Sequence, residues 1–290
     1  MIEVKNLVKR YGDHYAVNHL SFTVEDGQIF GFLGPNGAGK STTMNIMTGY
    51  LAATEGQVLV EGHDILEEPE AARACIGYLP EIPPLYPDMT VLEYLRFCAE
   101  LKKLPAERRK EDLDEVLSLT HLNGQAERLI RNLSKGYRQR VGLARALALS
   151  PRLVVCDEPV SALDVSVQAQ MLNLLADLQA ARGLTYVLVS HDLGVVRHSA
   201  DRVCVMFLGR VCEVGPTEAL FTAPRHPYTR FLLDSVPRPD PTRRGEGREL
   251  LPGEIPSPVT PPSGCRFRTR CPYAAPVCAQ APPPLQGTGE

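Results

Sequence analysis

The sequence lacks any long apolar run. Although 44% of its 290 residues are hydrophobic, no run approaches the roughly 18 residues that a membrane-spanning helix needs. A basic excess is also missing, because 31 Lys and Arg residues stand against 34 Asp and Glu residues, and this balance is not that of a dedicated nucleic-acid-binding protein. The first residues show no basic stretch followed by an apolar one, so we do not expect a secreted precursor. Any role at a membrane should therefore come through a partner protein.

Lysine is absent from the second half of the chain. All seven lysines lie within residues 1–135, whereas the remaining 155 residues contain 17 arginines and no lysine. Proline follows the opposite trend, since 16 of the 25 prolines lie from Pro216 onward. Runs such as residues 256–258 and 282–284 are incompatible with regular helix or a central strand. The composition predicts that the two halves differ in origin, and that the C-terminal region is irregular, poorly packed and solvated.

Short apolar runs alternate with helical stretches, which predicts an α/β fold. Residues 28–33, 153–156 and 185–189 are apolar throughout or nearly so, as expected of buried strands in a parallel sheet that is covered on both faces. Residues 167–181 have the pattern of an amphipathic helix, and residues 90–149 are almost entirely helical. The sequence therefore predicts an α/β core with an inserted helical block.

A glycine-rich stretch indicates a phosphate-binding loop. Residues 34–41 read GPNGAGKS and match the pattern G-x-x-x-x-G-K-[ST] between a predicted strand and a predicted helix. The glycines allow backbone N–H groups to converge on phosphate oxygens, which side chains would obstruct. Lys40 would neutralise the β- and γ-phosphates, and Ser41 would offer its hydroxyl to Mg²⁺. The spacing and the context favour a nucleotide site over a glycine turn with an idle lysine.

Two further strands end in groups suited to hydrolysis. Asp157 and Glu158 follow the apolar run at 153–156; there Asp157 can hold Mg²⁺ through water while Glu158 polarises a water for attack on the γ-phosphate. His191 ends the next apolar run. Parallel strands deliver both groups to one edge of the sheet, where His191 would hydrogen-bond the γ-phosphate.

The start of a later helix carries a second candidate phosphate contact. Residues 133–137 read LSKGY; Ser134 is a good N-cap, and with Gly136 it would present a helix N-terminus to a phosphate. This helix belongs to the inserted block, far from the phosphate loop of its own chain. It would then serve the nucleotide of another subunit, so the motif predicts a dimer.

Together these motifs resemble the ATP-binding subunits of ABC transporters over residues 1 to about 235. The resemblance implies a P-loop fold, bound ATP and Mg²⁺, catalytic roles for Glu158 and His191, and Mg²⁺ contacts by Ser41, Glu81 and Asp157. It implies nucleotide contacts by Tyr11, which would stack on adenine, and by Gly34, Pro35, Asn36, Gly37, Ala38, Gly39, Lys40, Ser41, Thr42, Ser134, Gly136 and Asp164. Two positions depart from the family pattern: Lys135 and Tyr137 alter the usual LSGGQ signature, and Glu81 stands where the family has glutamine.

The two halves resemble different branches of this family. Residues 1–145, with GYLPE at 77–81 and LSKGY at 133–137, resemble multidrug and gliding-motility export ATPases. From about residue 147 the chain resembles dipeptide and oligopeptide importer subunits, at residues 157–166, 226–229, 253–258 and 261–265. The chain is interpreted as a hybrid, natural or made. We predict an ATPase for peptide import, with export of the multidrug or gliding-motility type as the alternative.

Three cysteines in the tail need a separate interpretation. Cys265, Cys271 and Cys278 have the spacing C-x5-C-x6-C, which matches no standard zinc pattern. Some peptide-importer subunits carry a four-cysteine iron–sulfur site in this region, and here one ligand is missing unless Cys212 or another thiol reaches the site. We favour reduced thiols over a cluster.

The expected organisation is an ABC ATPase domain over residues 1–235, with a helical subdomain at about 84–150, and a Pro-rich, Cys-containing extension over 236–290. The expected partners are integral membrane permease subunits, which dock on about residues 81–135, a second ATPase subunit, identical or different, and a solute-binding protein for an importer. No nucleic acid is expected, and the location would be peripheral, on the cytoplasmic side of the cell membrane. A soluble ABC protein without a permease and a metabolic P-loop kinase are the rival functions; the kinase leaves LSKGY unexplained.

Overall fold

The computed structural model describes residues 1–235 and 254–285, so Gly253 of the importer-like stretch lies outside the described residues. The strands are β1 (Ile2–Tyr11), β2 (His14–Val24), β3 (Ile29–Leu33), β4 (Glu55–Val60), β5 (His63–Asp64), β6 (Ile76–Leu79), β7 (Leu153–Asp157), β8 (Thr185–Val189), β9 (Arg202–Phe207) and β10 (Arg210–Pro216). The helices are α1 (Lys40–Met47), α2 (Pro69–Ala74), α3 (Val91–Leu101), α4 (Ala106–Leu119), α5 (Lys135–Leu147), α6 (Val165–Arg182), α7 (Leu193–Ser199), α8 (Thr217–Thr222), α9 (Pro227–Asp234) and α10 (Val277–Gln280), with 3-10 turns η1 (Asn123–Gln125) and η2 (Ile130–Asn132). None of the described helices combines the length and the apolar character that crossing a bilayer requires.

The central sheet has six strands in the order β10-β9-β3-β8-β7-β6. All neighbours pair in parallel except β10, which lies antiparallel to β9 at one edge. Every residue of β3 and β8 is buried, because helices or a second sheet cover both faces of a parallel sheet. The predicted strands at 28–33, 153–156 and 185–189 are confirmed, and so is the predicted helix at 167–181, which forms part of α6.

A second, antiparallel sheet has the order β2-β1-β4-β5. Its apolar face packs with α1 against one face of the central sheet, where Phe22, Phe30 and Phe32 form an aromatic cluster with ring centroids 5.1–5.4 Å apart. The other face of the central sheet supports a larger core.

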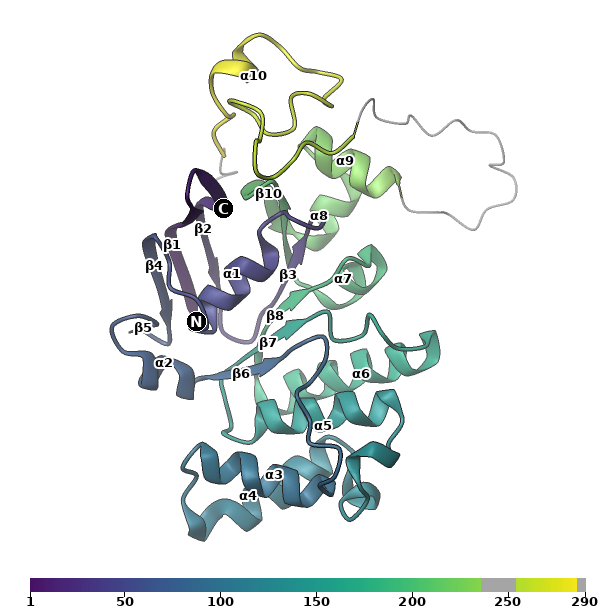
Figure 1. The fold of residues 1–290 in the computed structure, drawn as a ribbon. Helices are drawn as coiled ribbons and strands as arrows, with labels where there is room; N and C mark the ends of the chain where they lie inside the picture. The colour runs from purple at the N-terminus through teal and green to yellow at the C-terminus, as the bar shows by residue number, and fades with distance from the viewer. Residues whose placement is uncertain (236–253, 286–290) are drawn as a thin grey trace, which may run out of the picture.

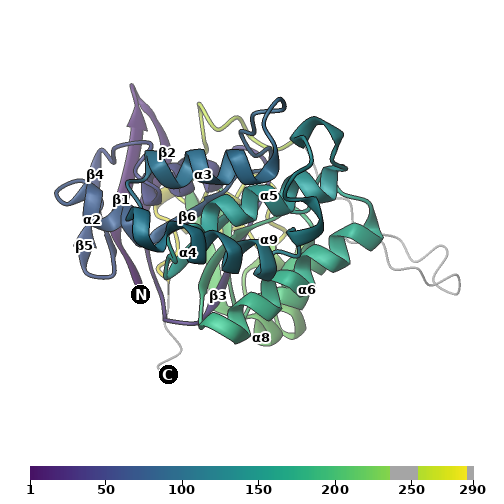
Figure 2. The same cartoon turned by 90° about the horizontal axis from the view of Figure 1, so that it is seen from below.

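The inserted block is helical, as the sequence predicts. Figure 2 shows α3, α4 and α5 side by side on one side of the molecule. Thr90 and Glu93 cap α3 reciprocally: the Thr90 hydroxyl accepts from the Glu93 amide at 3.2 Å, and the Glu93 carboxylate accepts from the Thr90 amide at 2.8 Å. Ser134 caps α5: its hydroxyl accepts a hydrogen bond from the Tyr137 amide, in the first turn of the helix, at 3.4 Å.

The C-terminal region corrects one expectation. Prolines were expected to leave it poorly packed, yet Phe267 is only 1% exposed and belongs to the larger core. Its ring lies 5.5 Å from that of Phe207 in β9 and 5.3 Å from that of Tyr228 in α9. In Figure 1 this region, coloured yellow, lies beside β10 and α9. One aromatic side chain therefore joins an otherwise irregular segment to the ATPase core.

Candidate functional site

The phosphate loop connects the end of β3 to the start of α1. Its three glycines have positive φ angles, of 153° at Gly34, 79° at Gly37 and 98° at Gly39. A Cβ atom at Gly34 would lie 2.4 Å from the Met206 carbonyl oxygen, and one at Gly39 would lie 2.5 Å from the Ala16 carbonyl oxygen. Only glycine fits both places, because the loop passes directly over backbone.

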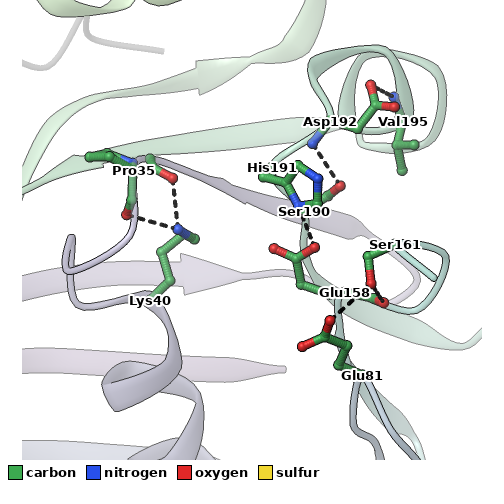
Figure 3. A network of polar contacts seen from close by, with 10 residues as sticks. Pro35, Lys40, Glu81, Glu158, Ser161, Ser190, His191, Asp192 and Val195 are labelled. Atoms are coloured by element: carbon green, nitrogen blue, oxygen red, sulfur yellow. Dashed lines mark hydrogen bonds and ion pairs between the residues drawn. The ribbon is translucent and has the colours of Figure 1, made fainter.

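Lys40 begins α1 and is 7% exposed. Its ammonium donates to the carbonyl oxygens of Gly34 at 2.7 Å and Pro35 at 3.0 Å (Figure 3). Burial lowers the pKa of Lys40, while nearby Glu158 and Asp157 act in the opposite direction. It makes no ion pair with any described residue. A buried ammonium with only neutral acceptors suits an anionic phosphate.

The ends of β7 and β8 meet beside this loop. Asp157 is in register with Val189, and the amide of Glu158 donates to the Val189 carbonyl at 3.0 Å. This pairing places His191, two residues further on, against Glu158: the carboxylate accepts from the His191 Nδ1 at 2.5 Å (Figure 3). Glu158 is the more enclosed partner, with a side chain 18% exposed against 65% for His191.

A third carboxylate completes the group. The Ser161 hydroxyl lies 3.3 Å from a Glu81 carboxylate oxygen and 3.1 Å from the Glu158 carbonyl, so that Glu81 comes to the same edge of the sheet (Figure 3). Burial raises the pKa of Asp157, and repulsion from Glu158 and Glu81 adds to the rise. A bound cation would relieve this repulsion.

The chemistry of these groups fits Mg²⁺ together with a phosphate. Across the described residues, no three His, Cys, Asp or Glu side chains are grouped so that they could hold a metal by themselves. Mg²⁺ characteristically takes only one or two carboxylates and completes its octahedron with water and phosphate oxygens. Asp157 and the exposed hydroxyl-bearing Ser41, which follows Lys40 in α1, suit that role.

Other predicted site residues lie apart from this group. Tyr11 ends β1 and is 51% exposed, with the Lys9 ammonium 5.1 Å from its ring centroid. Asp164 precedes α6. Ser134 and Gly136 lie at the start of α5, and a Cβ at Gly136 would lie 2.5 Å from the Val167 side chain. No hydrogen bond in the described part of the chain joins Ser134 or Gly136 to the phosphate loop.

The residues that hold the loop from behind are distant from it in sequence and were not predicted. Met206 and Ala16 support it as described, and the Gly209 amide donates to the Ala38 carbonyl at 2.9 Å. These contacts come from β9, β2 and the β9–β10 turn, and no local motif marks them.

The cysteines are all free thiols. Cys98, Cys156 and Cys204 are buried, and burial raises the pKa of the Cys156 and Cys204 thiols to about 12. Cys265 and Cys271 pack against the larger core. Burial raises the pKa values of Cys212 and Cys271, and each lies close enough to Cys265 for its charge to add to the rise. The described residues contain no group of three side chains that could hold a metal by themselves, and the preference for reduced thiols over a cluster stays a prediction.

A phosphate loop after the central strand of a parallel sheet, with carboxylates on the neighbouring strand ends, defines a P-loop nucleotide-binding protein. A family model described as ABC transporter matches residues 17–161, and another, described as the oligopeptide/dipeptide transporter C-terminal region, matches residues 212–278. The chain belongs to the ABC transporter family and is of the ATP-binding subunit type.

Curated relatives match this chain over nearly its whole length. A putative peptide import ATP-binding protein of Brucella ovis is 41% identical over 302 aligned residues, which cover 99% of this chain and 94% of that protein. The oligopeptide transport ATP-binding protein OppF of Salmonella typhimurium is 42% identical over 285 residues, covering 94% of this chain and 85% of OppF.

Solved structures agree on the fold. CbiO1 of Clostridium perfringens, part of the ABC transporter complex CbiONQ, superposes with a TM-score of 0.71 at 28% identity, over 77% of this chain and 90% of that one. The ATP-binding cassette MJ0796, solved as a dimer bound to ADP and Pi, gives a TM-score of 0.66 at 30% identity, over 75% of this chain and 99% of that one. The predicted α/β P-loop fold is thereby confirmed.

Proposed function

We propose that this protein binds and hydrolyses ATP to drive peptide import through a separate membrane permease. The observation that carries the ATPase function is the buried Lys40 ammonium in the phosphate loop, beside the Asp157 and Glu158 carboxylates. The match to the oligopeptide/dipeptide transporter C-terminal region and the relatives named for peptide import support the substrate class.

Within the site, each group has a distinct task. The loop amides and Lys40 would hold the β- and γ-phosphates. Glu158 would accept the proton of the attacking water, and His191, which donates to its carboxylate at 2.5 Å, would keep that carboxylate in place and contact the γ-phosphate. Mg²⁺, held by Ser41 and Asp157 with Glu81 nearby, would neutralise charge on the phosphates. Tyr11 would stack on adenine.

The working unit would be a head-to-tail dimer. No hydrogen bond among the described residues joins Ser134 or Gly136 to the phosphate loop of their own chain, and the helix N-terminus they form is suited to an anion. A partner subunit, identical or different, would supply them across the interface, with Asp164 nearby. The dimeric MJ0796 cassette supports this arrangement.

We also propose how the chain divides into domains and which branch of the family it belongs to. Residues 1–235 would form the ATPase domain, with the helical subdomain at about 84–150, and residues 236–290 the extension. The export-like resemblance of residues 1–145 remains a prediction, and export remains the alternative function. Peptide-stimulated ATPase activity in the presence of a permease and a solute-binding protein would favour import.

A cationic cavity suits the permease partner. It has a volume of about 370 Å³ and lies between the end of α1, β6, α2, α3 and α5; its lining includes Arg73, Lys102 and Arg145. None of these three forms an ion pair with a described residue, and one Arg145 nitrogen is buried without a hydrogen-bond partner. Burial and the neighbouring Arg145 lower the pKa of Lys102. We propose that an acidic side chain of a permease subunit binds here, at the cytoplasmic face of the membrane.

The test of the ATPase function replaces Glu158 by Gln, which keeps the shape and removes the base. Loss of a general base lowers turnover by roughly 10²–10⁴-fold, while ATP still binds. On size exclusion with ATP and Mg²⁺, the variant should shift from monomer to dimer. The matched control is Glu111→Gln on α4, an exposed position with the same change of charge, which should behave as wild type. Turnover of Glu158→Gln near that of the control would contradict the assigned role, and Lys40→Ala should abolish nucleotide binding.

A further inference from the structure

Two arginines meet where the C-terminal region lies beside the edge strand of the central sheet (Figure 1). Arg210 begins β10 and is the register partner of Phe207 in β9, and directly opposed residues of an antiparallel pair project from the same face. The Phe207 ring lies 5.5 Å from the ring of Phe267, and Arg266 directly precedes Phe267. The packing of the two rings therefore brings Arg266 of the C-terminal region next to Arg210 of the ATPase core.

Both guanidinium groups have only neutral acceptors. The Arg210 Nη2 donates to the Asn18 Oδ1 at 3.2 Å, and the Arg266 Nη1 donates to the Pro262 carbonyl oxygen at 3.3 Å. Within residues 1–235 and 254–285, neither arginine forms an ion pair. The Nε atoms of both side chains are buried and have no hydrogen-bond partner.

The proximity of the two charges is also evident in their electrostatics. Burial lowers the pKa of Arg266, and repulsion from Arg210 adds to the fall. Two like charges thus share a partly buried place, which is unfavourable unless an opposite charge lies close to both. Buried N–H donors are almost always paired in folded proteins, so this arrangement fits an anion that accepts hydrogen bonds from both side chains.

The acidic residue of the same strand has other partners. Glu213 in β10 accepts hydrogen bonds from the backbone amides of Arg225 and His226, at 2.9 and 3.0 Å. These bonds tie its carboxylate to the start of α9, which Pro227 begins. Glu213 forms no ion pair with any residue that the structure describes. It therefore does not balance the charge of the two arginines.

The chemistry of the pair favours a phosphate group. A guanidinium presents its N–H donors in a planar fork that matches the spacing of oxygens in carboxylate and phosphate groups. Two guanidinium groups carry two positive charges, and a phosphate monoester carries about −1.5 to −2 at pH 7, whereas a carboxylate carries only one negative charge. Arg210 and Arg266 are both partly exposed, so a small anion can approach them from solvent.

We propose that Arg210 and Arg266 form a second phosphate-binding site, which takes the dianion of inorganic phosphate or of a small phosphate monoester. The site shares no residue with the phosphate loop at 34–41, and it does not depend on the function proposed above. One arginine belongs to the ATPase core and the other to the C-terminal region. A phosphate bound by both side chains therefore bridges the two parts of the chain and stabilises their contact by mass action.

The test is calorimetric titration with inorganic phosphate at constant ionic strength. Every protein compared carries Lys40→Ala, which weakens phosphate binding at the nucleotide loop. On this background, Arg210→Gln and Arg266→Gln should each raise the Kd for phosphate about ten- to a hundredfold, because each removes charge-assisted hydrogen bonds. The matched control is Arg230→Gln, an exposed position on α9 with the same loss of charge, which should change the Kd less than about twofold.

A conservative variant separates binding from a general loss of structure. Arg266→Lys keeps the charge but loses the planar fork, so its Kd should lie between those of the parent protein and Arg266→Gln. Hydrogen exchange gives a second readout: phosphate should slow exchange in residues 262–268 of the parent protein but not in Arg266→Gln. Titration with glycerol phosphate identifies the source of the anion. Binding comparable to that of inorganic phosphate assigns the site to monoesters, and much weaker binding assigns it to the free anion.

Two results would overturn the proposal. The first is a single Kd for phosphate shared by Arg210→Gln, Arg266→Gln and the Arg230→Gln control, because the two arginines would then make no specific contribution. The second is acetate binding as tight as that of phosphate, because a site matched to a dianion should bind a monoanion at least about tenfold more weakly.

Discussion

Replacing Phe267 by Ala should reveal whether the C-terminal region shares the core of the ATPase. Phe267 is 1% exposed, and its ring contacts those of Phe207 and Tyr228 at 5.5 and 5.3 Å between centroids. Truncation of a buried phenylalanine to alanine costs roughly 3–5 kcal/mol, and each aromatic pair adds about 0.5–1.5 kcal/mol beyond the buried area. We therefore expect a loss near the upper end of that range, unless the core relaxes into the space.

The measurement is urea denaturation followed by tryptophan-independent signals such as circular dichroism, since the chain contains no Trp. The midpoint should fall while the slope stays constant, as for a stability change without a change in the surface exposed on unfolding. The matched control is Tyr273→Ala, in the same region but 65% exposed, which should stay within about 0.5 kcal/mol of wild type.

Two results would refute the reasoning about Phe267. One is the same urea midpoint for Phe267→Ala and Tyr273→Ala, because truncating a residue of the shared core must lower the free energy of unfolding more than truncating an exposed residue does. The other is a new early transition that leaves the main midpoint unchanged, because the C-terminal region would then unfold as a separate unit.

Two further predictions concern the carboxylates and the cationic cavity. Asp157→Asn should abolish Mg²⁺-dependent turnover yet raise the thermal midpoint of the nucleotide-free protein, because burial, Glu158 and Glu81 raise the pKa of Asp157. Above its raised pKa the Asp157 carboxylate is charged in the folded protein and destabilises it. The rise in thermal midpoint caused by Asp157→Asn should therefore shrink as the pH falls towards the unfolded-state pKa of about 3.9. A rise that does not depend on pH would contradict the assigned cause. Lys102→Gln should weaken pull-down of the permease without changing soluble ATPase activity, whereas exposed Lys103→Gln should change neither; equal pull-down by both variants would exclude an acidic partner group at Lys102.

Local sequence patterns were sufficient for the parts of the site that follow buried strands. The apolar runs that became β3, β7 and β8 have one interpretation in a covered parallel sheet, and the groups after them reach the same edge because parallel strands share a direction. Glu158 and His191 were therefore predicted as neighbours, and the structure has them in contact at 2.5 Å. Their assigned roles in hydrolysis remain predictions.

The antiparallel sheet was not predicted, and its strands explain why. The pairing of β1 with β2 contains register shifts, including one between Val4 and Leu7. Such bulges break the regular alternation of apolar and polar residues on which a strand prediction depends. The proline content of the C-terminal region likewise led to a wrong prediction of poor packing, because composition gives no weight to the single aromatic residue, Phe267, that anchors the region in the core.

What the sequence alone determined is the chemistry: the spacing of residues 34–41 requires a phosphate loop, and two strand ends supply a carboxylate pair and a histidine. Such motifs are readable because their residues are close together in the chain. Tertiary structure decided which segments surround them. Phe267 against Phe207 and three cations around one cavity both join residues distant in sequence, and contacts of this kind depend on how whole elements pack rather than on any local pattern.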